Sequence, residues 1–159
     1  MTMDEGLRQR LLFLIRVIEK EQGYLSYSCN KLFAESEVLT SQQMLAIQGN
    51  PESCETLEAF VSRFCRLQDN IGDKLLISWM KAVQEKPGTF IDNLDRAEKL
   101  GLLLSADSWV MLRQSRNKMI HEYIEDIHEL TDAVNMAKQG IELLTDFAEK
   151  LIADVRKRL

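Results

Sequence analysis

Apolar residues recur at steps of three and four over most of this chain, the spacing that puts side chains on one face of an α-helix. The first such run begins near Asp4 and continues into the thirties. Gly23 lies inside it, at a point where a helix can bend or break. We predict a long first helix whose apolar face is made of Leu7, Leu11, Leu14, Ile18, Leu25 and Leu32.

A second long helix is predicted to begin at Asn50-Pro51-Glu52. Asparagine is a good N-cap, proline suits the first helical position, and an acid suits the positive end of the helix dipole. Residues 35–51 before it are weakly patterned, so we expect a loop with at most one helical turn. The apolar stripe ends before Lys86-Pro87-Gly88 and consists of Leu57, Phe60, Phe64, Leu67, Ile71, Leu75 and Trp79.

Three further helices complete the pattern. Thr89, with Asp92 three residues later, is typical of a helix start, and Gly101 is typical of an end. Ser105 precedes a helix over about 106–122. The last helix has the most regular heptad spacing, with Leu130, Val134, Ala137, Ile141, Leu144, Ala148, Leu151 and Val155.

The composition favours a few long helices in one compact domain. The 159 residues include only 7 Gly and 2 Pro, so few turns are available. The fold class is therefore expected to be all-α, an antiparallel bundle of four to five helices, with residues 1–159 forming a single domain. No apolar run approaches a membrane span and the polar start lacks a signal-peptide core, so a cytoplasmic protein without membrane contact is expected.

Charge and cysteine content exclude some kinds of site. Cys29, Cys54 and Cys65 have no metal-ligand spacing, and with only 2 histidines in the chain we expect no metal site and no cofactor. The net charge of −5 works against loose, charge-driven nucleic-acid binding. It leaves room for an enzyme that holds RNA through a small basic site.

The segment Arg116-Asn117-Lys118-Met119-Ile120-His121-Glu122-Tyr123 is the strongest candidate for chemistry. On an ideal helix Arg116 falls in the middle of an apolar arc, where a guanidinium is costly unless it snorkels or meets a carboxylate or phosphate. Its position leaves these options open. The other members of the arc are Trp109, Leu112, Met119, Ile120 and Tyr123.

Arg116, Asn117 and His121 form a sensible set for metal-free RNA cleavage. Histidine exchanges a proton near neutral pH, arginine stabilises charge on a phosphate, and asparagine can orient the imidazole or a sugar hydroxyl. Arg116 and His121 diverge by ~140° on one continuous helix. They converge if the helix loosens near His121 or if a second copy completes the site. As ordinary structural alternatives, a histidine near a helix end, such as His128, is usually a surface or capping residue, and a tyrosine on an apolar face usually belongs to the core.

The spacing of Arg116, His121 and Tyr123 matches the R-x4-H-x-Y arrangement of the HEPN superfamily, and the chain resembles the HepT-like toxins of prokaryotic toxin–antitoxin modules. Trp109 and the apolar stretch before Arg116 follow the same pattern. A second block, Arg63-Phe64-Cys65-Arg66-Leu67 followed by Ile71-Gly72-Asp73, resembles that family's Arg-rich helix and its Gly-acidic pair, with Asp73 where Glu is more usual.

This resemblance implies a HEPN-like helical bundle that forms a homodimer with two motifs at a shared groove. It implies that Arg116 and His121 are the ribonuclease residues, that Asn117 supports them, and that Asp73 is a further supporting position. Related toxins are neutralised by a minimal nucleotidyltransferase antitoxin that attaches AMP to the motif tyrosine, here Tyr123. Arg116 and Tyr123 lie within ~20° on the wheel, so phosphate on Tyr123 would meet Arg116 and compete with the RNA substrate.

Two other functions compete with a ribonuclease toxin. One is a non-catalytic, nucleotide-binding partner of a nucleotidyltransferase, which needs Arg116 but no titratable His121. The other is a helical protein with a silent motif that only mediates interactions. The presence of Arg116, Asn117, His121 and Tyr123 together favours the ribonuclease.

Overall fold

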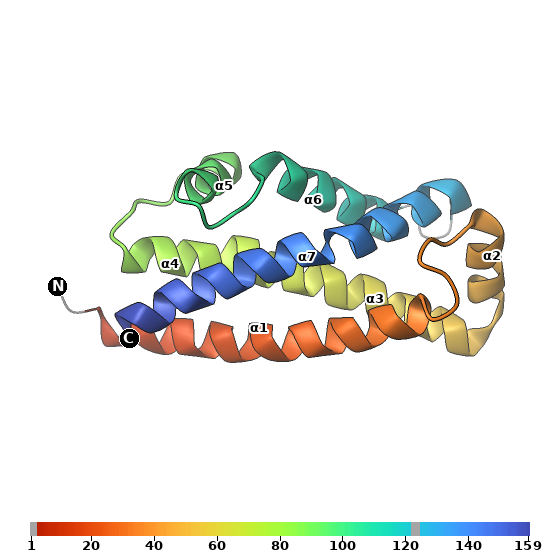
Figure 1. Cartoon of the computed structure of the whole chain (residues 1–159), viewed down its shortest axis with the longest axis horizontal. Helices are drawn as coiled ribbons and strands as arrows, with labels where there is room; N and C mark the ends of the chain where they lie inside the picture. The colour runs from red at the N-terminus through yellow and green to blue at the C-terminus, as the bar shows by residue number, and fades with distance from the viewer. Residues whose placement is uncertain (1–2, 122–124) are drawn as a thin grey trace.

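The computed structural model describes residues 3–121 and 125–159, and every regular element in these ranges is helical, which confirms the all-α prediction. Successive long helices run in opposite directions along one axis, and the two termini lie near the same end (Figure 1). The long elements are α1 (Glu5–Leu32), α3 (Pro51–Asp69) with its continuation, α6 (Ala106–His121) and α7 (Ile127–Arg158). Two short helices, α2 (Ser41–Gly49) and α5 (Phe90–Lys99), cross opposite ends of this bundle.

The predicted helix starts are confirmed by their capping bonds. The Asp4 carboxylate accepts from the Leu7 amide at 3.1 Å, ahead of α1. The Asn50 side chain accepts from the amide of Glu52, ahead of α3, and Thr89 does the same for α5. These are local bonds within a few residues, which is why the sequence predicts them. α1 continues through Gly23 without interruption.

The prediction that residues 35–51 form a loop was wrong. Thr40 and Gln43 form a capping box, with the Gln43 amide donating to the Thr40 hydroxyl at 3.1 Å, and α2 follows. Only Met44 of this helix is buried, so its sequence carries no apolar stripe. The segment before α2 is held by Asn135 of α7. The Asn135 side chain accepts a hydrogen bond from the Leu39 amide and donates one to the Leu39 carbonyl oxygen, both at 2.9 Å. Contacts with α7 therefore help to stabilise a helix that the local pattern of apolar residues does not predict.

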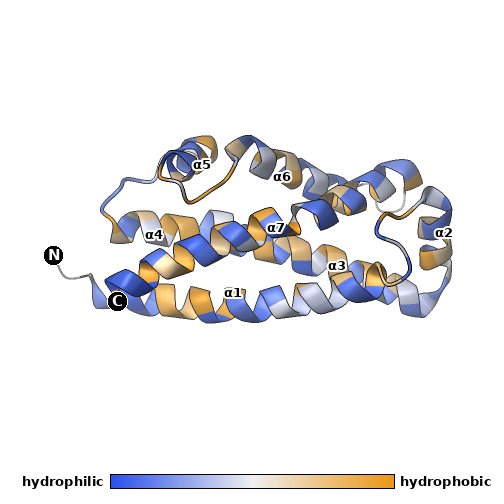
Figure 2. Cartoon of the chain, viewed as in Figure 1, coloured by the Kyte–Doolittle hydropathy of each residue, from blue (hydrophilic) through white to orange (hydrophobic). Residues whose placement is uncertain are grey.

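The core lies between the long helices, whose apolar faces point inward (Figure 2). Trp109 of α6 is fully buried, and its ring meets that of Phe147 edge-on with centroids 5.2 Å apart. Gly72 lies against the same indole, where an added Cβ would come within 3.1 Å of the ring. This close approach fixes α6 against the middle of the α3 arm, the continuous helical segment of residues 51–82. Within the described ranges, no helix has both the length and the apolar character to span a bilayer.

The α3 arm is one continuous rod that contains a π-helical segment. α3 continues through η1 (Asn70–Leu75) into α4 (Leu76–Ala82). A π-helical turn is wider than an α-helical one and shifts the following side chains around the axis. Asn70 at its start is buried and donates to the buried carboxylate of Glu21 on α1. Asp73 within it faces α6 instead.

Candidate functional site

Arg116 meets a carboxylate from the neighbouring helix. Its guanidinium donates to Asp69 at the end of α3 over 2.7 Å, with the two side chains 21% and 31% exposed. Of the options open from sequence, the structure shows the one in which Arg116 meets a carboxylate. The pair is joined at one point only: Arg116 Nε and Asp69 Oδ1 are both buried and have no hydrogen-bond partner among the described residues.

A second, parallel ion pair lies one turn earlier on α6. Arg113 donates to Asp73 of η1 at 3.1 Å and lies over the Phe90 ring, 4.5 Å from its centroid. Asp73, proposed from sequence as a supporting residue, is thus in contact with Arg113, and Asp69 is the carboxylate in contact with Arg116. The two pairs fasten α6 to the α3 arm at successive turns.

Asn117 and His121 lie on the exposed side of the same helix. The Asn117 side-chain oxygen accepts from Arg116 at 3.3 Å, so these two predicted site residues are in contact. His121 is the last residue of α6 and its side chain is exposed. Among the described residues no hydrogen bond joins His121 to Arg116 or to Asn117. Tyr123, the predicted AMP acceptor, lies outside the described residues.

The other histidine has a structural setting. His128 stands in the first turn of α7, and its Nδ1 lies 2.9 Å from the Ser41 hydroxyl of α2. This agrees with its interpretation as a surface or capping residue. Nearby, Lys118 and Glu129 form a 3.0 Å ion pair between α6 and α7. This ion pair joins α6, which ends before residues 122–124, to α7, which begins after them.

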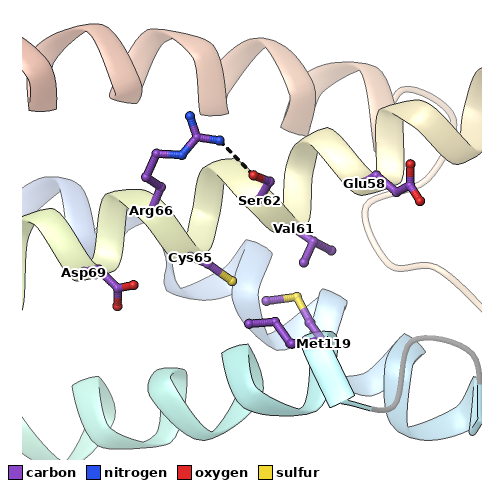
Figure 3. Close-up of a pocket in the computed structure, with 8 residues that line it drawn as sticks. Glu58, Val61, Ser62, Cys65, Arg66, Asp69 and Met119 are labelled. Atoms are coloured by element: carbon purple, nitrogen blue, oxygen red, sulfur yellow. Dashed lines mark hydrogen bonds between the residues drawn. The ribbon is translucent and has the colours of Figure 1, made fainter.

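A groove of about 470 Å³ opens between α3 and the last turns of α6. Figure 3 shows Cys65, Asp69 and Met119 directed into it, whereas Arg66 projects from α3 toward α1. Its floor is apolar and its rim carries charges, among them Asp69, which binds Arg116. The residues lining it are Glu58, Val61, Ser62, Cys65, Arg66, Asp69, Met119 and Ile120.

Cys65 is the groove residue with the largest change in acidity. Burial raises the pKa of the Cys65 thiol to about 11, against the opposing effect of the positive charge on Arg116. The thiol therefore stays protonated at neutral pH and is a poor nucleophile. Cys65 therefore contributes packing to the groove, and His121 remains the proton-transfer residue of the predicted motif.

Asp69 is the site residue that sequence reasoning missed. The chain does carry a signal for it. Asp69 and Asp73 are four residues apart on one arm, and Arg113 and Arg116 are three apart on another, so two facing helices can pair them turn by turn. Which carboxylate meets which guanidinium depends on the relative shift of the two helices, and that shift is decided by Trp109 against Gly72.

The arrangement has the properties of an anion site next to a proton carrier. Arg116 is bound to Asp69, which lines the groove, Asn117 contacts Arg116, and His121 is exposed one turn further along. In the part of the chain that the structure describes, no group of three or more His, Cys, Asp or Glu side chains is arranged to hold a metal ion.

Comparison of the chain with protein-family models, curated proteins and solved structures found no match.

Proposed function

We propose that this protein is the toxin of a toxin–antitoxin module, a metal-independent endoribonuclease that cleaves RNA through Arg116, Asn117 and His121. The observation that carries the proposal is the placement of Arg116. It is an arginine on an apolar helix face, held by Asp69, which lines the groove, with Asn117 beside it. A rigid guanidinium with spare donors is well suited to a phosphodiester, since it needs little further ordering when the anion arrives.

The proposed reaction is an internal transfer on the RNA strand. His121 takes the proton from a 2′-hydroxyl, whose oxygen attacks the adjacent phosphorus. The bond from phosphorus to the 5′ oxygen breaks, and that oxygen takes up a proton. Arg116 stabilises the negative charge that grows on the non-bridging oxygens. The products are a 2′,3′-cyclic phosphate and a 5′-hydroxyl end.

A homodimer and a partner enzyme complete the proposal. On one helix Arg116 and His121 diverge by ~140°, so a second copy of α6 across a shared groove brings an arginine and a histidine onto one phosphate. The antitoxin is a minimal nucleotidyltransferase that transfers AMP to Tyr123. The added phosphate is negatively charged and competes with RNA for Arg116.

Paired substitutions test the ribonuclease directly. His121→Ala and Arg116→Ala should each lower RNA cleavage by about 10²–10⁴-fold, the usual cost of losing proton transfer or charge stabilisation, and relieve growth arrest. His128→Ala and Arg113→Ala are matched controls, because one removes the other histidine and the other removes the neighbouring ion-paired arginine. Both controls should cleave RNA within a few-fold of wild type. Cleavage should persist in EDTA and leave cyclic-phosphate ends.

Retention of full cleavage by His121→Ala would remove the ribonuclease from consideration. The second candidate, a nucleotide-binding partner of a nucleotidyltransferase, would then gain. One observation favours that candidate: among the described residues, no hydrogen bond orients the His121 ring. A nucleotide binder would show saturable AMP or ATP binding that Arg116→Ala abolishes and His121→Ala leaves unchanged.

Modification at Tyr123 is tested by intact-mass spectrometry after co-expression with a neighbouring nucleotidyltransferase. We expect the mass of one or more AMP units on the wild type and none on Tyr123→Phe, which lacks the acceptor oxygen. Tyr123→Phe should stay toxic while escaping suppression. A fully neutralised but unmodified wild type would instead show that inhibition works by binding alone.

A further inference from the structure

Two tyrosines of α1 are exposed, and one of them, Tyr24, lies beside α3. Tyr24 is 55% and Tyr27 is 66% exposed. Lys20 and Lys31 share their edge of the helix, since all four residues fall within an arc of ~60°. An exposed pair of aromatic rings between two cations is an unusual use of a helix edge that contributes little to the core.

Arg63 of α3 lies beside Tyr24. Arg63 reaches across to α1, where it donates to the Tyr24 carbonyl oxygen at 3.0 Å and to the Ser28 hydroxyl. Its guanidinium carbon lies 5.7 Å from the centroid of the Tyr24 ring. The cation holds one side of the ring and more than half of the side chain stays open. The ring is thus positioned before any ligand arrives.

The positive charge of this surface is not neutralised by carboxylates. Arg96, Arg113, Arg116, Arg156 and Arg158 each form an ion pair. Arg63 and Arg66 form none among the ion pairs of the described residues, and Arg66 donates only to Ser62, at 2.8 Å. Arg63 and Arg66 therefore keep their positive charge without an ion-paired carboxylate among the described residues, although the chain as a whole has a net charge of −5.

Arg66 connects this surface with the groove next to Arg116. It lines that groove together with Asp69, and its side chain turns toward α1 (Figure 3). Burial raises the pKa of Glu21 on α1, and the positive charge of Arg66 opposes that rise. Arg66 therefore belongs to two surfaces, because it lines the groove beside α6 and its side chain is directed toward α1.

We propose that Tyr24, Tyr27, Arg63 and Arg66 form a binding surface for single-stranded nucleic acid, with bases stacked on the tyrosines and phosphates bound by the arginines. Every base offers a ring face, so such a surface accepts different sequences. Paired bases hide these faces, so a duplex is a poor ligand. The inference rests on the proposed function in that the strand leads to Arg116, but binding does not require cleavage.

Fluorescence anisotropy with a labelled single-stranded oligodeoxynucleotide tests the surface, because DNA lacks the 2′-hydroxyl that the proposed cleavage needs. Tyr24→Ala and Tyr27→Ala should each weaken binding at least fivefold, as loss of a stacked base typically does. Tyr27→Phe should bind like wild type, since it keeps the ring. Arg66→Gln should lower the slope of log affinity against log salt by about 0.7, the value for one phosphate contact on a single strand.

Controls are taken from other exposed positions. Leu104→Ala removes an apolar side chain of similar exposure, 64%, and Lys157→Gln removes an exposed charge at the end of α7. Both should bind within twofold of wild type, and a duplex of the same length should bind more weakly. Unchanged affinity in both tyrosine variants, or tighter binding of duplex, would overturn the inference and assign the surface to a protein partner.

The outcomes for the surface and for the ribonuclease are separable. Binding that depends on the tyrosines without any RNA cleavage would support the surface and contradict the proposed function. Cleavage whose KM for RNA is unchanged in Tyr24→Ala and Tyr27→Ala would support the function and contradict the surface.

Discussion

At the scale of single residues, the site is governed by the cost of removing charge from water. Arg116 lies on the inner face of α6 and is balanced by Asp69 at 2.7 Å. Partly exposed pairs of this kind contribute only about 0–1 kcal/mol to folding, but removing one partner leaves the other uncompensated. Arg116 Nε and Asp69 Oδ1 are buried and have no hydrogen-bond partner among the described residues, so a single hydrogen bond joins the two side chains.

Burial of the Glu21 carboxylate also removes charge from water, and among the described residues no cation forms an ion pair with it. Its side chain is buried on α1 and accepts from Asn70, while Oε2 has no partner among the described residues. Burial raises the pKa of Glu21, and the hydrogen bond from Asn70 and the charges of Arg66 and Lys74 offset this only in part. The folded protein therefore holds the proton more tightly than the unfolded chain, and its stability falls as the pH rises through the window between the two pKa values.

We predict that Glu21→Gln stabilises the protein at pH 7. The amide is neutral and keeps an oxygen to accept from Asn70. The thermal midpoint should rise by a few degrees, as about 1 kcal/mol produces in a domain of this size. The gain should shrink as the pH falls below the raised pKa, where wild-type Glu21 is itself protonated. Scanning calorimetry across pH measures this, with exposed Glu149→Gln as the control. A constant or absent gain would contradict the titration of Glu21.

At the scale of helices, close approach decides how the elements fit together. α6 packs against α7 where Gly140 faces Leu112: a Cβ on Gly140 would lie 2.2 Å from a methyl carbon of Leu112. α6 packs against η1 where Gly72 faces Trp109. Small residues at two crossings therefore place the Arg116 helix between its neighbours, with Met119 and Ile120 toward the groove.

Two glycine substitutions with opposite effects test this packing. Gly140→Ala should destabilise the protein by about 1–3 kcal/mol, because overpacking outweighs the better helix propensity of alanine. Gly23→Ala is the matched control in the interior of α1, where an added Cβ meets nothing within 4 Å. It should stabilise by about 0.5–1 kcal/mol. Urea unfolding of both variants gives the comparison, and stabilisation by Gly140→Ala would show that α6 and α7 are less tightly packed.

At the scale of the whole molecule, the bundle leaves its candidate site on an open edge. The groove beside Arg116 has an apolar floor, and Ile120 at its rim is 49% exposed. In the proposed homodimer this edge faces the same edge of the second copy, as a two-fold interface requires. The tyrosine and arginine surface of α1 and α3 then continues outward from each groove.

The proposed dimer predicts a specific effect at Ile120. Ile120→Glu should shift the wild-type dimer to monomer in sedimentation velocity at micromolar concentration, because a charge would be buried at the interface. Leu104→Glu introduces the same charge at a 64% exposed position elsewhere and should remain dimeric. RNA cleavage should fall together with dimerisation. A monomeric wild type that still cleaves RNA would contradict a site shared between two copies.

The helices whose formation depends on neighbours along the chain could be predicted from the amino-acid pattern alone. The caps at Asp4, Asn50 and Thr89 bond to amides two or three residues away, and apolar periodicity marks the buried faces of α1, α3 and α7. It also identified the segment around Arg116 as the place where an apolar face carries a charge. These are local properties, so they can be predicted without knowing the packing.

Features that depend on contacts between residues far apart in the sequence could be known only from the three-dimensional structure. α2 lacks an apolar stripe and is held in place with Asn135, about a hundred residues away, so its helix was missed. Asp69, and not Asp73, meets Arg116, because the π-helical segment and the contact of Trp109 with Gly72 set the shift between α3 and α6. Shifting one helix by a turn leaves its local pattern of apolar and polar residues unchanged. Only close packing of the core selects one relative position of the two helices.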